Sequence, residues 1–363
     1  MTTPTVRPGE ASRIAAPDEG ITLDELRLAA RNHGMPLEAL RYDLTPPGLH
    51  YVLVHYDIPY VDPATWRLSI DGQVRTPFGL DLAALRARPK VETTVTLECA
   101  GNGRAKLHPR PVSQPWLDEA VGTARWTGTP LVDLLADAGL LEDAVDVVFT
   151  GLDHGSDRGV EQDYQRGLAL TELTDVLVAY EMNGQPLPPQ HGAPARLIVP
   201  GWYGMASVKW LSRITVLAER FTGFQNEVAY RIKDDPDSPG VPVTRIKPRA
   251  LMVPPGFPDF MTRRRIVEAG PVDLFGRAWC GSTPVDRVEV SVDNGLTWAD
   301  ADLGRIGSPY AWRSWTLRWD ASPSDTVLLA RATAGGVAQP VDQPWTTQGV
   351  TNNMTQRVLV TVR

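Results

Sequence analysis

The sequence has little cysteine and no long hydrophobic segment. Its 363 residues include only Cys99 and Cys280, which excludes a framework of several disulfides and argues against a zinc site built from cysteines. No stretch approaches the roughly 20 consecutive apolar residues that a membrane-spanning helix needs, so we expect no membrane partner.

Positive charge is also not in excess. Lys and Arg number 36 against 43 Asp and Glu, which gives a net charge of −7. Such a chain lacks the bulk positive field that holds nucleic acid, so we expect no nucleic-acid partner. Residues 1–20 contain neither the apolar segment of a secretion signal nor a twin-arginine motif. We therefore expect a flexible arm there and a cytoplasmic location.

The length predicts about two domains, and a polar stretch divides the chain. Residues 234–240 read Asp-Asp-Pro-Asp-Ser-Pro-Gly, which is typical of a turn or linker. We therefore expect an N-terminal arm and short helix over 1–43, a first domain over 44–240 and a second over 241–363. Within the first segment, Thr22-Leu23-Asp24-Glu25 has the form of a capping box, and Gly34 is placed to end the helix that follows.

Strand and helix patterns mix in the first domain, whereas the second has only strand patterns. Residues 91–98 alternate apolar and polar side chains, which predicts a strand. Thr129-Pro130 predicts the start of a helix that ends at Gly139. After residue 241 several short alternating runs follow, and Asp293-Asn294-Gly295 is a strong hairpin signal. The predicted fold class is α+β, with a mixed α/β domain followed by a β-sandwich.

The segment after residue 98 is the most informative for chemistry. A predicted strand ends at Glu98, and Cys99 then stands in a loop of small residues, 100–103. Basic side chains follow at every second position and would share one face of an extended segment; they are Arg104, Lys106, His108 and Arg110. Nearby cations favour the thiolate, which binds soft metals or attacks as a nucleophile. The residues alone leave a buried structural role for Cys99 equally open.

A second group of glycines, cations and aromatic side chains occupies residues 191–210. It places His191, Arg196 and Lys209 around glycines whose backbone a ligand can approach, as an anionic cofactor requires. Each short motif taken singly is also compatible with an ordinary turn and a core histidine.

Together these motifs resemble the sulfite oxidase family of molybdopterin enzymes, in particular its haem-free bacterial members. Residues 99–102, Cys-Ala-Gly-Asn, are similar to the family's molybdenum–cysteine loop. The segments that match its cofactor-binding core in order and spacing are 179–184, 191–196, 199–201 and 208–211. Residues 287–298 resemble its immunoglobulin-like dimerisation domain. The resemblance extends from about residue 44 to the C-terminus.

The resemblance implies a molybdenum–molybdopterin cofactor, no haem, and a homodimer. Cys99 would be the protein ligand of the metal, with Tyr230 and Arg104 as further catalytic residues. The positions implied to bind the cofactor are Tyr51, Val52, Leu53, Val54, His55, Cys99, Asp153, His191, Arg196, Ser207, Val208 and Lys209.

The sequence departs from the family pattern at several cations. Leu53, Gln348 and Gly103 stand where the resemblance leads us to expect arginines, although Arg104 is retained. Residues 31–33 spell the family's Arg-Asn-His motif, but His33 lies 22 residues before His55. We interpret that triplet as unrelated to the site.

Four functional hypotheses follow. The first is oxygen-atom transfer, with sulfite to sulfate as the leading reaction and an external electron acceptor. The second, within the same family, is the reduction of nitrate or an S-oxide, so the expected substrate is a small oxyanion or S-oxide. The third is a metal-free hydrolase or transferase with Cys99 as nucleophile and His191 or His55 as base. The fourth is a binding module without catalysis.

Overall fold

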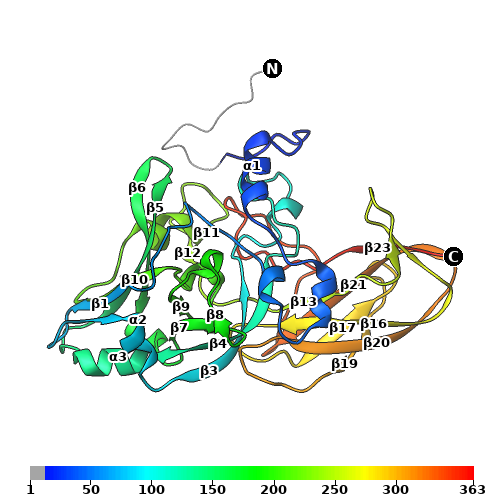
Figure 1. Ribbon diagram of the computed structural model, residues 1–363. Helices are drawn as coiled ribbons and strands as arrows, with labels where there is room; N and C mark the ends of the chain where they lie inside the picture. Colours follow the sequence, from blue (N-terminus) through cyan, green and yellow to red (C-terminus); the bar gives the residue numbers. More distant parts are fainter. Residues whose placement is uncertain (1–12) are drawn as a thin grey trace.

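The computed structural model describes residues 13–363, and strands dominate its secondary structure (Figure 1). The α-helices of this range are short: α1 (Leu23–Arg31), α2 (Leu82–Arg86) and α3 (Leu131–Ala138). Single 3-10 turns lie at 37–41, 47–49, 104–106, 170–172, 189–191 and 204–206, and a π turn lies at 225–229. None of the helices in residues 13–363 has the length and apolar character needed to cross a membrane. The structure thus supports the β-rich part of the α+β expectation.

The predicted capping box begins α1. The Glu25 N–H donates to Thr22 Oγ1 at 3.2 Å, and the Thr22 N–H donates to Glu25 Oε2 at 2.9 Å. The prediction that Gly34 ends this helix is wrong, because the chain is already extended at Asn32, with φ −119°.

The part of the expected arm that the structure describes is packed against the first domain. The Ala15 N–H donates to the Arg110 carbonyl at 2.8 Å, and Ala15 is only 4% exposed. Residues 13–20 are therefore not a free arm, and residues 1–12 of that prediction lie outside the described residues.

The first half of the chain forms two sheets, which Figure 1 shows in cyan and green. One has the order β2 (Phe78–Asp81), β1 (Arg67–Gly72), β10 (Leu211–Leu217), β5 (Asp146–Asp157), β6 (Val160–Ala169). The other has the order β3 (Val91–Glu98), β4 (Val121–Pro130), β7 (Leu177–Met182), β8 (Gln185–Pro186), with β9 (Arg196–Ile198) also paired to β7. A ribbon of β11 (Arg231–Ile232) and β12 (Val241–Pro242) flanks the predicted linker.

The strand predicted over residues 91–98 is confirmed as β3, but the C-terminal half of its polar face is buried. Thr96 and Glu98 are 2% and 1% exposed. The Trp312 N–H, from the second half of the chain, donates to Thr96 Oγ1 at 2.8 Å. The alternation identified the strand correctly, yet these two polar side chains bind the other domain rather than water. The helix that ends at Gly139 is likewise confirmed as α3, with Pro130 rather than Thr129 as its N-terminal flanking residue.

The second half of the chain forms two further sheets, drawn in yellow to red in Figure 1. One has the order β13 (Arg249–Met252), β16 (Gly270–Trp279), β20 (Arg313–Ala321), β19 (Asp302–Leu303). The other has the order β14 (Phe257–Pro258), β15 (Arg265–Val267), β23 (Val358–Val362), β21 (Ser324–Ala334), β17 (Arg287–Ser291), β18 (Ala299–Asp300), with β22 (Val337–Ala338) paired to β21. Side chains from both sheets share one buried cluster, which includes Trp315, Leu328 and Val360. The predicted turn is present, with φ 59° at Asn294 and 87° at Gly295.

A buried ion pair joins the two halves of the chain. Arg249 at the start of β13 is 0% exposed and pairs with the carboxylate of Glu98 at the end of β3. Its Nη2 also lies 3.1 Å from Asp118 Oδ1, and Trp279 Nε1 donates to Glu98 Oε2 at 2.8 Å. Because Glu98 directly precedes Cys99, the second domain fixes the start of the cysteine loop.

We expect Arg249→Met to destabilise the protein by about 3–5 kcal/mol, because it leaves the carboxylate of Glu98 buried without its cation and removes one of the two cations at Asp118, which keeps Lys106. Urea denaturation measures the change. Arg318→Met is the matched control, since Arg318 forms an ion pair with Asp273 while its side chain is 60% exposed, and it should change stability little. Equal effects of the two substitutions would contradict the importance of the buried pair.

Candidate functional site

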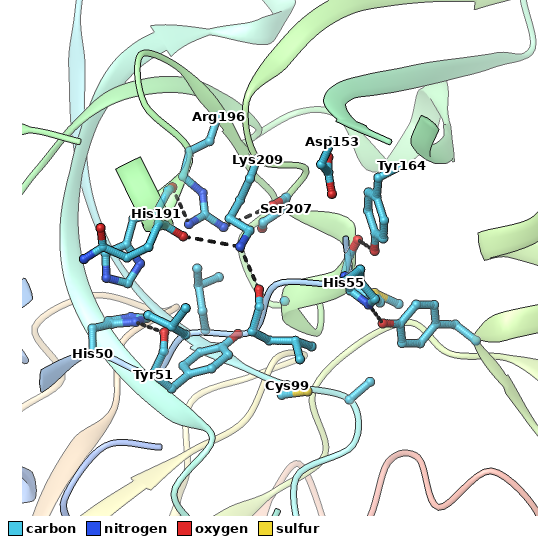
Figure 2. A pocket seen from close by; sticks show the side chains of 18 residues that line it. His50, Tyr51, His55, Cys99, Asp153, Tyr164, His191, Arg196, Ser207 and Lys209 are labelled. Atoms are coloured by element: carbon cyan, nitrogen blue, oxygen red, sulfur yellow. Dashed lines mark hydrogen bonds between the residues drawn. The ribbon is translucent and has the colours of Figure 1, made fainter. Parts of the chain in front are cut away.

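A cleft with an empty volume of about 610 Å³, part of it open to solvent, lies beside the end of β3 (Figure 2). The site residues predicted from the sequence that line it are Tyr51, Val52, Leu53, His55, Cys99, Asp153, His191, Arg196, Ser207, Lys209 and Tyr230. They come from segments far apart in the sequence, so the fold brings the predicted set together.

Three predicted residues do not line this cleft. Val208 is buried behind it, and its N–H already donates to the Ala206 carbonyl at 3.1 Å. Val54 and Arg104 line an adjoining cavity that shares Leu53, His55, Cys99 and Tyr230 with the cleft. Arg104 therefore lies next to the cleft, in a cavity lined by part of the predicted cofactor-binding wall.

The Cys99 loop is held by its own backbone and by Asn102. The Asn102 N–H donates to the Cys99 carbonyl at 3.0 Å, and Asn102 Nδ2 donates to Glu98 Oε1 at 3.0 Å. A side chain at Gly101 would lie 2.7 Å from the guanidinium of Arg104, so that guanidinium would have to move to admit one. Burial raises the pKa of the Cys99 thiol, and the charge of Arg104 opposes that rise.

The prediction that the basic side chains after Cys99 share one face is wrong. Residues 104–106 form a 3-10 turn instead of an extended segment. Lys106 Nζ binds Asp118 Oδ1 at 2.6 Å, whereas Arg110 Nε binds Glu25 Oε1 at 2.8 Å. Arg104 alone of this group reaches the cavity beside Cys99.

Two cations line the cleft with neutral partners, Arg196 buried and Lys209 partly buried. Lys209 Nζ donates to the carbonyls of Leu53 at 2.6 Å and Gln190 at 3.3 Å. The Arg196 guanidinium donates to the carbonyls of His191 and Ser207, each at 3.0 Å. Burial lowers the pKa of Lys209 to about 7 and that of Arg196 to about 10. Among residues 13–363, neither cation has a carboxylate within ion-pair distance, so both can receive an anionic ligand.

Three histidines complete the polar lining: His50 and His191 are buried, whereas His55 is exposed. Burial lowers the pKa of His50 to about 4 and that of His191 to about 2. These rings are therefore neutral at physiological pH and act through hydrogen bonds rather than charge. His55 Nε2 shares a hydrogen bond of 2.7 Å with Tyr230 Oη.

Asp153 is a buried carboxylic acid with an unused oxygen. It is 4% exposed, and its Oδ1 has no hydrogen-bond partner within the described part of the chain. Burial raises the pKa of Asp153 to about 6, and the charge of Lys209 opposes the rise. Such an oxygen is expected to accept a hydrogen bond from a ligand.

The wall at residues 51–55 is fixed by the Arg-Asn-His triplet interpreted above as unrelated to the site. His33 and Val52 exchange two backbone hydrogen bonds, of 3.1 Å and 2.9 Å. The Val54 N–H donates to Asn32 Oδ1 at 2.7 Å. Asn32 and His33 support the wall from behind, and Asn32 also lines the adjoining cavity beside Cys99, so the interpretation of the triplet as unrelated to the site is wrong.

Sequence reasoning missed several residues that line the cleft: His50, Tyr164, Gln190 and Met205. His50 directly precedes the predicted wall, so extension of that wall by one residue would have found it. Tyr164 lies on β6 and donates from Oη to the Met205 carbonyl at 2.8 Å. Its position depends on how the β5–β6 hairpin packs, and no local motif marks it.

The cleft fits an anionic, polar cofactor. It combines the buried Arg196 and the partly buried Lys209, neither of which has a carboxylate partner among the described residues, with the unused oxygen of Asp153 and close approaches at glycine positions. A side chain at Gly192 (φ 101°) would lie 2.9 Å from Lys209 Cβ, and one at Gly204 would lie 2.3 Å from Tyr51 Oη. Within residues 13–363 no cluster of three or more His, Cys, Asp or Glu side chains is arranged to hold a metal ion. A metal bound by Cys99 would thus need further ligands from a cofactor.

Comparison with known families gives two adjacent matches. The model described as the oxidoreductase molybdopterin binding domain matches residues 55–225. The model described as the Mo-co oxidoreductase dimerisation domain matches residues 257–363.

Curated relatives include a sulfite oxidase and a nitrate reductase. Mitochondrial sulfite oxidase of Mus musculus is 36% identical over 349 residues, which cover 88% of this chain and 62% of that protein. The NADH nitrate reductase, clone PBNBR1412, of Brassica napus is 28% identical over 364 residues, which cover 88% of this chain and 38% of that protein. The chain thus spans 62% of the length of the sulfite oxidase that it matches.

Among solved structures, the sulfane dehydrogenase SoxCD from Paracoccus pantotrophus is similar in fold. It superposes with a TM-score of 0.79 at 25% sequence identity, and the match covers 91% of this chain and 86% of that one. The similarity extends over both halves of the chain.

The lowered pKa of Lys209 predicts a pH effect on the cofactor-free protein. In the unfolded chain a lysine stays protonated up to about pH 10.4, whereas folded Lys209 loses its proton near pH 7. Between these values the unfolded state binds more protons, so the contribution of Lys209 to stability rises with pH. We therefore expect Lys209→Met to stabilise the cofactor-free protein most below pH 7, with a gain that shrinks towards pH 10.

Thermal unfolding of cofactor-free protein across this pH range checks the expectation. Lys90→Met is the control, because Lys90 is exposed. A gain from Lys209→Met that does not change with pH, or one equal to that of Lys90→Met, would contradict it.

Proposed function

Because this chain belongs to the sulfite oxidase family of molybdopterin oxidoreductases, we propose that it binds a molybdenum–molybdopterin cofactor in the cleft and oxidises sulfite to sulfate. The observation that carries the proposal is the convergence of the Cys99 thiol with the cations Arg196 and Lys209 in one cleft. The identity of 36% to a sulfite oxidase supports the choice of substrate.

Each group of the cleft has a role in holding the cofactor. Cys99 would supply the thiolate ligand of the metal. Arg196 and Lys209 would pair with the phosphate of the pterin, which supplies the negative charge that both lack. The free Oδ1 of Asp153 would accept a hydrogen bond from an N–H of the ring system. When bound, such a cofactor supplies the oxygen atom that is transferred and takes up two electrons.

Tyr230 and Arg104 act on the substrate side. Burial raises the pKa of Tyr230, so its hydroxyl stays protonated and can donate a hydrogen bond. His55 holds that hydroxyl in position at 2.7 Å. Arg104, beside Cys99, is a buried cation whose hydrogen bonds within the described chain go to the carbonyls of Gln348 and Gln114, which leaves its charge available to an oxyanion.

One observation favours a second candidate, a reductase of the same family. Leu53 and Gln348 are neutral where the family resemblance leads us to expect arginines, and both line the cavity next to Cys99. The relative from Brassica napus is a nitrate reductase. The hydrolase hypothesis is disfavoured, because burial raises the pKa of the Cys99 thiol and no histidine of residues 13–363 forms a hydrogen bond with its sulfur.

The remaining parts of the proposal concern partners and location. The match of residues 257–363 to a dimerisation domain supports a homodimer through an immunoglobulin-like second domain. The electrons leave to an external acceptor, without a haem in this chain. We keep the cytoplasm as the proposed location, where the free thiols of Cys99 and Cys280 are stable.

We expect the purified protein from a host that makes the cofactor to contain about one molybdenum per chain. Cys99→Ser should stay folded but lose nearly all sulfite oxidation, because serine is a poor ligand for a soft metal centre. Elemental analysis and steady-state assays with sulfite and an artificial electron acceptor measure both effects.

Cys280→Ser is the matched control, since Cys280 is also a buried free thiol but lies in the second domain. It should keep both metal and activity. Wild-type protein without molybdenum, or full activity in Cys99→Ser, would overturn the proposal. Assays with nitrate and methionine sulfoxide as oxidants separate the reductase from the oxidase.

A further inference from the structure

The hairpin between β5 and β6 closes with a two-residue turn, Arg158-Gly159. Asp157 pairs with Val160 across the turn. Both central residues have positive φ, 51° at Arg158 and 76° at Gly159. This combination is typical of a type I′ turn, which matches the twist of an antiparallel pair.

Arginine is a poor residue for the first central position of such a turn. Positive φ brings the Cβ of an L-residue close to the backbone, so Asn, Asp and Gly are preferred there. The requirements of the turn therefore do not explain Arg158. An unfavourable backbone conformation of this kind indicates that the side chain has a function at this position.

The Arg158 side chain reaches a cavity next to Cys99. This second cavity has an empty volume of about 1030 Å³, part of it open to solvent, and Arg158, Arg104 and Tyr230 all line it. The side chain of Arg158 is only 20% exposed. Its guanidinium carbon lies 5.6 Å from the ring centre of Phe224, and its Nε lies 3.7 Å from Asp157 Oδ1. The aromatic contact holds the cation at the cavity, and Asp157, which also lines the cavity, balances part of its charge.

Two neutral side chains line the same cavity at positions where the family resemblance leads us to expect arginines. Leu53 is apolar, and Gln348 carries an Oε1 without a hydrogen-bond partner in the described part of the chain. Arg104 and Arg158 are close enough to interact, because the charge of Arg158 adds to the effect of burial in lowering the pKa of Arg104. Two cations from separate parts of the chain thus face one cavity beside Cys99.

We propose that Arg158 is the second substrate-binding cation of this enzyme and that, with Arg104, it selects a small sulfur oxyanion with more than one negative charge. The inference rests on the proposed function and deepens it. Arg158 reaches the cavity from the tip of a hairpin. It therefore supplies the positive charge that neither the wall residue Leu53 nor the C-terminal residue Gln348 carries. As a binding group it acts on the bound substrate and on the transition state alike.

The test compares Arg158→Asn with Arg263→Asn in the molybdenum-loaded enzyme. Arg263 is a matched control, because it also has positive φ (58°) but lies in the turn before β15, outside the cavity. Asparagine suits positive φ better than arginine, so both variants should unfold at the wild-type temperature or above it. Only Arg158→Asn should raise the KM for sulfite, by roughly tenfold, with kcat nearly unchanged. Arg158→Lys should restore much of the affinity.

Unchanged KM in Arg158→Asn, or a lower unfolding temperature with no change in affinity, would overturn the role of Arg158. A second measurement keeps the test independent of turnover. Sulfate should raise the unfolding temperature of wild type and Arg263→Asn more than that of Arg158→Asn. If the wild type oxidises no sulfite but this sulfate difference is present, the proposed reaction fails while the anion site stands. If sulfate stabilises all three proteins equally, the anion site fails.

Discussion

The buried ion pair between Glu98 and Arg249 is the constraint on which the site depends. It takes two charges fully out of water, which is favourable only when both are well paired. The pair fixes the last residue of β3, so the next residue, Cys99, leaves the strand in one defined direction. Asn102 binds the same carboxylate, and thus both ends of the cysteine loop are attached to one group. The second domain therefore shapes the cysteine loop although it does not line the cleft.

The charged groups of the cleft are not paired with each other. Glu98 and Arg249 form an ion pair, whereas Arg196 and Lys209 donate hydrogen bonds only to carbonyl groups. A protein pays for such uncompensated cations in stability, and the arrangement persists when a ligand relieves it. Cofactor binding and completion of the fold are therefore coupled here. The single thiol of Cys99 is consistent with this coupling, since the other ligands of the proposed metal would arrive with the cofactor.

The sequence predicted the parts that local patterns encode. The strand over residues 91–98 follows from its period of two, and the Cys99 loop and the residues 191–209 follow from a family motif. The failures have physical causes. The basic side chains after Cys99 diverge, because a 3-10 turn at residues 104–106 replaces the extended segment. Arg158 and Tyr164 reach their cavities through the packing of a hairpin against distant segments, and such packing leaves no local pattern.

The contacts between the two halves of the chain have a consequence for biosynthesis. The loop that contains Cys99 depends on Arg249, and the Thr351 N–H donates to the Ala100 carbonyl at 2.7 Å. Both partners are made long after the loop itself, about 150 and 250 residues further along the chain. The loop therefore reaches its final conformation only once synthesis has passed residue 351. A translation product truncated before that residue would leave the loop without these supports.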